Sequence, residues 1–303
     1  MLEVRRLRLL RELAHRGTIA AVAEALAYTP SAVSQQLSAL EDEAGVELLE
    51  RSGRRVTLTP AARALVRHTD SILERLERAE AELAEARHGA SGPLRIGTFP
   101  TAAQAIVPAA LKALGVDCPA LEPFVSEIDP AQVADALRVG ALDVALIHEY
   151  DFVPAAALPG LATEPLFSEA MYLAWARGRA ARRESIADWK DSPWIVATPG
   201  TLCHAMTVRA CQAAGFEPQV RHRVDEYATV LALVAAGQGV SLVPELATAH
   251  LPRGVSLTPM PMSRRTRVAY RRGAEAHPAI VAVIRALRRA IPPKLAEPRQ
   301  KGP

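Results

Sequence analysis

The order of short helical segments in the first sixty residues constrains the fold more than any other feature of the chain. Residues 2–16 carry leucines at helical spacing and end at Gly17, which readily takes the left-handed conformation that follows a helix. Thr18 can cap a second short helix over residues 19–25. Thr29-Pro30 then opens a third helix, because proline at the first helical position loses no hydrogen bond. This order predicts a helix-turn-helix.

The third helix, expected from Pro30 to about Glu41, has two different faces. Val33, Leu37 and Leu40 repeat at i, i+4 and i+7, so that side should pack inward. The opposite side carries only short or amide side chains, namely Ser31, Ser34, Gln35 and Ser38. Amides pair with adenine edges and hydroxyls reach bases or phosphates, so this face suits the major groove of DNA. A solvated polar face is the alternative, because helix-turn-helix spacing is common in all-α proteins.

An arginine-rich hairpin should follow this helix. Residues 48–59 are typical of two short strands around a glycine turn, and they include Arg51, Arg54 and Arg55. Such a wing would lie over the DNA backbone or the adjacent minor groove, although a solvated charge run is possible. The net charge of +3 adds nothing, because acidic residues balance the arginines within the first sixty residues.

The amino-terminal residues resemble the winged helix of LysR-type transcriptional regulators, a bacterial family. The resemblance is carried by Thr29 to Leu37, Leu40-Glu41, Gly45-Val46, Leu48-Leu49, Arg51 and Leu58 to Ala61. Members usually have phenylalanine in place of Leu49 and glycine in place of Ala62, which we interpret as packing variants. The resemblance implies a DNA-binding domain over residues 1–59 that contacts promoter DNA through Thr29, Pro30, Ser31, Ser34, Gln35, Ser38, Arg51, Arg54 and Arg55.

A long linker helix is expected over residues 60–87. Its apolar positions alternate by four and three, as in the seam of a coiled coil, at Leu65, Thr69, Ile72, Leu76, Ala79, Leu83 and Ala86. The flanks are highly charged, so we expect a partner helix to cover the seam, although packing within the same domain is the alternative. In the resembling family this helix pairs between subunits, which implies a homodimer or homotetramer. Residues 88–93 are interpreted as a hinge.

From Leu94 onward, short apolar strands alternate with helices, as in parallel α/β domains. We expect strands at 94–98, 121–125, 143–148, 171–175, 194–197, 220–224, 240–243 and 268–271. Residues 94–97, 136–147 and 233–240 resemble the sensor of the same family. The resemblance implies an effector-binding domain over 94–290 that is shaped like a periplasmic binding protein, with subdomain I at 94–164 and 254–290 and subdomain II at 165–253. Residues 291–303 are predicted to be a disordered basic tail.

The small-molecule effector should bind beyond the carboxyl ends of these strands, where helix N-termini offer free N–H groups. The candidate contacts are Thr98, Pro100, Thr101, His148, Thr198, Thr201, Leu202 and Glu226. Each has a structural alternative, because Thr198 and Thr201 would cap helices in any case and a histidine at a strand end is often a core residue. Helix N-termini favour a small carboxylate, whereas Asp225 and Glu226 suit an amine. A zwitterion such as an amino acid would satisfy both.

The cysteines offer a second hypothesis, because peroxide-sensing members of the family carry a reactive pair in the helix that holds Cys203 and Cys211. Here the first cysteine is displaced by one position relative to that pattern. A thiol-based redox sensor is therefore the alternative function, and small apolar roles for both thiols are the simpler interpretation.

Other classes of protein fit the sequence less well. No phosphate loop, metal-ligand cluster or nucleophile elbow occurs in the sequence, so we expect neither an enzyme nor a bound cofactor. A solute-binding protein would share the carboxy-terminal fold but would carry a signal peptide and no winged helix. The amino terminus lacks an apolar core, and the longest apolar stretch, near residues 228–236, is too short for a membrane span. We expect a soluble, cytoplasmic protein without membrane contacts.

Overall fold

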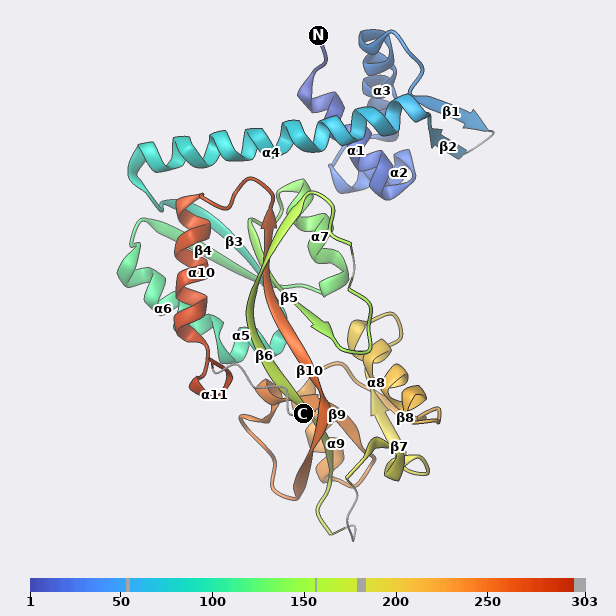
Figure 1. Cartoon of the computed structure of the whole chain (residues 1–303), viewed down its shortest axis with the longest axis vertical. Coiled ribbons are helices and arrows are strands. Elements are labelled where there is room, and N and C mark those ends of the chain that lie inside the picture. Colours follow the sequence, from blue (N-terminus) through green and yellow to red (C-terminus); the bar gives the residue numbers. More distant parts are fainter. Residues whose placement is uncertain (53–54, 156, 179–183, 297–303) are drawn as a thin grey trace. The chain divides into compact units, whose positions relative to one another are not determined.

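The computed structural model describes residues 1–52, 55–155, 157–178 and 184–296 (Figure 1). The chain divides into two compact units. Unit 1 comprises residues 1–86 and 271–277, and unit 2 comprises the remainder. Each unit has its own hydrophobic core.

Unit 1 begins with a winged helix-turn-helix. Its elements are α1 (Val4–Arg16), α2 (Ile19–Ala25), α3 (Pro30–Ala44), β1 (Leu49–Ser52), β2 (Arg55–Leu58) and α4 (Pro60–His88). The predicted caps are present, since Thr18 Oγ1 accepts from the Ala21 N–H and Thr29 Oγ1 from the Ala32 N–H, each at 3.2 Å. Leu49 and Ala62, the two departures from the family pattern, are both buried in the core of this unit.

The wing is an antiparallel pair in which Leu49 faces Leu58 and Ser52 faces Arg55. Arg54, which the sequence predicts in the turn, lies outside the described residues, and so do the side chains of Arg51 and Arg55. The two predicted strands are therefore present and paired. The contacts that the three arginines make stay a prediction.

The helix α4 has 29 residues, about 43 Å at 1.5 Å per residue. Several apolar side chains of its predicted seam are open in the single chain, because Ile72, Leu76 and Leu83 keep 36%, 37% and 57% of their surface exposed. Leu73, by contrast, is buried within the chain. The open seam is what a partner helix would cover.

Unit 2 contains one six-stranded sheet with the order β4-β3-β5-β10-β6-β9 and a separate parallel pair β7-β8. The strands are β3 (Gly92–Thr98), β4 (Leu121–Glu127), β5 (Val144–Tyr150), β6 (Leu161–Ala176), β7 (Pro193–Val196), β8 (Gln219–Arg223), β9 (Ser241–Pro244) and β10 (Val255–Arg271). The helices are α5 (Pro100–Ala105), α6 (Val107–Asp117), α7 (Pro130–Val139), α8 (Leu202–Ala213), α9 (Tyr227–Ala235), α10 (Pro278–Ala290) and α11 (Pro293–Ala296), with 3-10 turns η1 (Ile186–Trp189) and η2 (Glu245–Thr248).

The α/β class is as predicted, but two strands are far longer than the sequence indicated. β6 has 16 residues and β10 has 17, and they run side by side through the length of unit 2 (Figure 1). β10 pairs antiparallel with β5, and β6 pairs antiparallel with β9, so the sheet is mixed rather than parallel throughout. The sequence did not predict the full length of these strands, because the buried charged residues Glu169 and Arg264 interrupt their apolar pattern.

The carboxy-terminal prediction also needs correction. Residues 293–296, expected to be disordered, form the short helix α11, and Leu295 is only 5% exposed. Proline at the start of the helix and burial of one leucine explain this order. Residues 297–303 lie outside the described part of the chain.

Candidate ligand cavity and nucleic-acid interface

Unit 2 contains a cavity of about 320 Å³ at the carboxyl ends of the parallel strands. Segments that follow β3, β4, β7 and β8 meet there with the end of β5, which is where open α/β sheets bind ligands. The lining is mainly apolar with a few polar groups: Phe99, Pro100, Thr101, Glu127, Ile128, Asp129, Pro130, His148, Ala197, Thr201, Leu202, Cys203, Asp225, Tyr227 and Arg264.

The structure brings five of the eight predicted effector residues together in this cavity, namely Pro100, Thr101, His148, Thr201 and Leu202. The other three lie elsewhere. Thr98 is fully buried in β3, and Thr198 donates to the Asp225 carboxylate at 2.7 Å. Glu226 caps α9, accepting from the N–H groups of Ala228 and Thr229 at 2.8 and 2.6 Å.

Several lining residues were not predicted. Glu127 ends β4 and Asp129 follows it, so both could have been found by the same strand-end argument. Arg264 could not, because it lies in the middle of β10, a region that the apolar pattern did not identify as a strand.

His148 is the most unusual polar group in the cavity wall. It is 6% exposed, and neither of its ring nitrogens has a hydrogen-bond partner among the described residues. The ring packs edge-on against Phe99 and Tyr150, at centroid distances of 4.8 and 5.2 Å. Burial, and then the charge of Arg264, hold the pKa of His148 well below its usual value, so the ring is neutral near pH 7. A buried polar group without a partner costs about 1–3 kcal/mol, which a ligand in the cavity would offset.

Arg264 forms a buried ion pair behind the cavity. Its Nη2 and Nε lie 2.7 and 2.8 Å from Glu169 Oε1, and both side chains are 1% exposed or less. Nη2 also donates to Thr101 Oγ1 at 2.9 Å. Burial opposes the charge, yet the Glu169 carboxylate raises the pKa of Arg264, so the guanidinium stays cationic. The pair connects β6 and β10, and its Arg264 lines the cavity.

Cys203 lies in the cavity wall between two tyrosines. Its Sγ is 3.3 Å from the Tyr150 hydroxyl and 3.6 Å from the Tyr227 hydroxyl, which donates to it. Cys211 is fully buried, and burial raises the pKa of its thiol to about 12. The two cysteines lie eight positions apart in α8, about 12 Å of rise, so a disulfide between them requires α8 to unwind.

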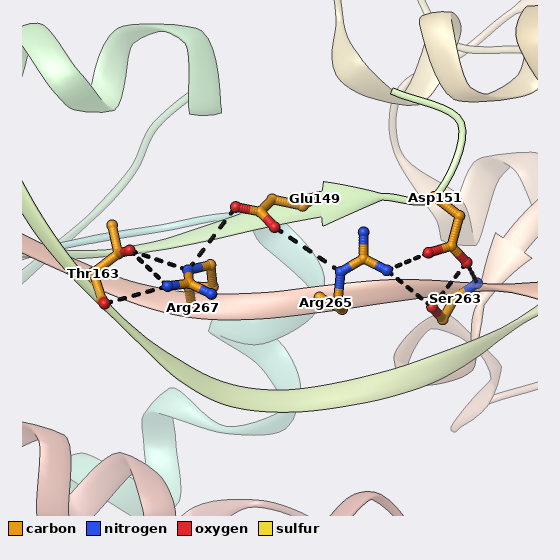
Figure 2. Close-up of polar contacts among 6 residues, drawn as sticks. All are labelled: Glu149, Asp151, Thr163, Ser263, Arg265 and Arg267. Carbon is orange, nitrogen blue, oxygen red and sulfur yellow. Dashed lines mark hydrogen bonds and ion pairs between the residues drawn. The ribbon is translucent and has the colours of Figure 1, made fainter. Parts of the chain in front are cut away.

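The face of the β5–β10 pair opposite to His148 and Arg264 carries a row of charged side chains, here called the ladder (Figure 2). Arg265 pairs with Asp151 and lies 3.9 Å from Glu149, and Asp151 also accepts from Ser263 N and Oγ at 2.7 and 2.9 Å. Arg267 lies 3.9 Å from Glu149 and donates to Thr163 on β6 at 2.8 Å. These contacts link β5, β6 and β10 on the face of the sheet opposite to Arg264.

The exposed face of α3 has the composition expected of a DNA-reading helix. Thr29, Pro30, Ser31 and Gln35 are exposed and Ser34 and Ser38 are half-buried, whereas Val33, Leu37 and Leu40 are at most 1% exposed. The first turn of α3 has no acidic residue. The face therefore presents amide and hydroxyl groups without a charge that would repel phosphate.

Comparison with known proteins places both units in one family. The model of the LysR substrate binding domain matches residues 87–292, and that of the bacterial regulatory helix-turn-helix protein, lysR family, matches residues 4–63. The chain belongs to the LysR family of transcriptional regulators. LysR regulators bind promoter DNA, respond to a small-molecule effector and form homo-oligomers, and the fold of this regulator is as the resemblance implied.

Curated relatives cover most of the chain. A probable hydrogen peroxide-inducible genes activator of Mycobacterium leprae is 31% identical over 240 residues, which is 77% of this chain and 74% of the relative. The transcriptional dual regulator GltC of Bacillus subtilis is 28% identical over 248 residues, 80% of this chain and 81% of that protein.

Solved structures of the family resemble nearly the whole chain. A cysteine variant of OxyR from Corynebacterium glutamicum has a TM-score of 0.58 and 28% identity, covering 96% of this chain and 92% of that one. In the described part of this LysR regulator, no helix combines the length and hydropathy that a membrane span requires.

Proposed function

We propose that the effector of this LysR regulator binds in the 320 Å³ cavity of unit 2 and contacts Pro100, Thr101, His148, Thr201 and Leu202. The unpartnered His148 carries this proposal, because a nearly buried ring without hydrogen bonds is retained at a cost to stability. The protein then acts by binding rather than by catalysis: effector occupancy shifts the population of DNA-bound states. On this proposal residues 94–164 with 254–290, and residues 165–253, are the two sensor subdomains.

The test is His148→Phe, which keeps an aromatic ring and removes both nitrogens. Because those nitrogens have no internal partner, we expect the variant to be about 1–3 kcal/mol more stable than wild type while losing its ligand. Metabolites would be screened by thermal shift on the full chain, and calorimetry would then compare the variant with wild type for each compound that binds.

Thr266→Val is the matched control, because the Thr266 hydroxyl also lacks a partner but does not line the cavity. We expect this control to gain stability and keep its ligand. Retention of ligand affinity by His148→Phe would contradict the proposed site.

For the DNA-binding unit, we propose base contacts from the α3 face and phosphate contacts from the wing arginines. Gln35→Ala should weaken binding to the specific site by about 1–3 kcal/mol and leave non-specific binding unchanged. Arg54→Ala or Arg55→Ala should weaken binding to all sequences and lower the salt slope by about one per lost phosphate contact. Fluorescence anisotropy with the chain's own upstream DNA and scrambled DNA distinguishes the two effects. An equal loss on both DNAs for Gln35→Ala would contradict the base contact.

A second candidate function is peroxide sensing through Cys203. Relatives named as hydrogen peroxide-inducible genes activators favour it, as does the position of Cys203 in the cavity wall beside two tyrosine hydroxyls. The raised pKa of Cys211 and its separation along α8 oppose a rapid disulfide with that partner. Promoter binding would be measured with and without peroxide for wild type and Cys203→Ser. An identical response of the two proteins would exclude this candidate.

A further inference from the structure

We infer that the ligand of this cavity carries a protonated amine. The inference rests on the proposed function, since it concerns the same cavity, and it selects between the carboxylate and the amine that the sequence left open. Three carboxylates line the cavity, those of Glu127, Asp129 and Asp225. Arg264 is the one cationic side chain among the described residues of the lining, and Glu169 already neutralises it.

Hydrogen bonds hold two of these carboxylates in place without cancelling their charge. Asp129 caps α7 by accepting from the Ala131 N–H at 2.8 Å. Asp225 accepts from the N–H and the hydroxyl of Thr198, both at 2.7 Å. The carboxylate of Glu127 has no hydrogen bond or ion pair with any described residue. All the donors are neutral, so the mouth of the cavity keeps a net negative charge that a cationic ligand would balance.

Carboxylates at the opening of the cavity would not by themselves indicate a ligand. The unpartnered His148 ring is an independent observation that does. The ring lies in the same wall, is 6% exposed, and offers one donor and one acceptor nitrogen that no described residue uses. A ligand that pairs its amine with the carboxylates and a second polar group with His148 would satisfy both features.

The size of the cavity limits this ligand. At roughly 30 Å³ for each water-sized group, 320 Å³ accommodates on the order of ten non-hydrogen atoms. A small amine and a small amino acid both fit. The amino acid would also place a carboxylate near the first turn of α8, which follows its N-cap Thr201.

Four probes with the same four-carbon skeleton test the charge requirement: butylamine, 2-aminobutyrate, butyrate and butanol. Thermal shift and calorimetry on the full chain should detect binding of at least one amine-bearing probe and of neither butyrate nor butanol. Binding of butylamine would indicate a simple amine, and binding of 2-aminobutyrate alone would indicate an amino acid. Binding of butyrate, or of no amine-bearing probe, would overturn the inference.

Charge-neutral variants locate the amine. Glu127→Gln and Asp129→Asn remove one charge each, and asparagine at position 129 can still cap α7. Each should weaken the binding of the amine-bearing probe roughly two- to fivefold at low salt, since both groups are exposed. Glu122→Gln is the matched control, because Glu122 is an exposed acid on β4 that does not line the cavity. Equal affinities for all three variants and wild type would overturn the assignment.

The same experiment separates this inference from the proposed function. If butyrate binds and His148→Phe abolishes that binding, the cavity is the effector site and the amine is wrong. If 2-aminobutyrate, which has a second polar group for His148, binds with the same affinity to His148→Phe, the assignment of the cavity itself fails.

Discussion

Loss of the Glu169 charge should destabilise the sensor more than any conservative change on its surface. Glu169→Gln preserves the shape of the side chain but leaves the Arg264 guanidinium charged and 1% exposed without its counterion. Arginine cannot escape this cost by losing its proton. Breaking one side of a buried ion pair typically costs 3–5 kcal/mol, so we expect a loss of about that size in the free energy of unfolding.

The assay is urea unfolding followed by tryptophan fluorescence. All three tryptophans, Trp175, Trp189 and Trp194, belong to unit 2, so the signal reports on the sensor alone. The matched variants are Arg264→Met and the double replacement Glu169→Met with Arg264→Met. We expect the double variant to be much closer to wild type than Glu169→Gln, because apolar side chains of similar volume replace the whole pair.

Arg264→Met provides an independent check, because it removes the other partner and leaves the Glu169 side chain 0% exposed without its counterion. This variant should therefore also lose about 3–5 kcal/mol of unfolding free energy. A loss below about 1 kcal/mol for Glu169→Gln, as measured for solvated surface pairs, would refute the reasoning.

Three further changes have defined outcomes. Ala27→Gly should stabilise unit 1 by about 1 kcal/mol in a circular-dichroism melt, because Ala27 has φ 54°, in the left-handed region; an unchanged melting temperature would contradict this. Gly97→Ala should cost about 1–3 kcal/mol in the urea assay, since its Cβ would lie 2.5 Å from a Leu142 methyl; a neutral result would show that Leu142 moves easily. Burial opposes ionisation of Glu226, but the Ala228 and Thr229 N–H groups lower its pKa, so its stabilising effect is present above the unfolded value of about 4.3 and is lost as pH falls through the folded value. The difference between wild type and Glu226→Gln should disappear in acid, and a constant difference would exclude this cause.

The sequence predicted the DNA-binding unit well because local rules determine it. Thr18, Thr29 and Gly17 lie at helix ends where their caps and turns depend on near neighbours, and the structure has them there. The spacing of Val33, Leu37 and Leu40 likewise indicates one buried face without knowledge of the partner helices. Local sequence was therefore sufficient for these elements.

The cavity was predicted only in part, because long-range pairing determines it. Thr201 and Leu202 were found from a helix start, whereas Arg264 reaches the cavity through a strand whose buried charge is matched by Glu169, 95 residues away. A charged residue in a strand normally indicates an exposed position. Arg264 can be buried only because an opposite charge pairs with it, and the sequence alone does not show that partner. Glu226 differs for a local reason: its side chain caps its own helix, and the neighbouring Asp225 lines the cavity instead.

The β5–β10 pair carries cavity-lining residues on one face and the charged ladder on the other. Its inner face presents His148 and Arg264, and its outer face presents the ladder of Glu149, Arg265 and Arg267 (Figure 2). Successive side chains of a strand point to opposite faces, so a shift of one residue would exchange the two sets. Each exposed ion pair of the ladder contributes little to stability. Because the pairs form only in this register, they favour the one alignment that places His148 in the wall of the cavity proposed for the effector.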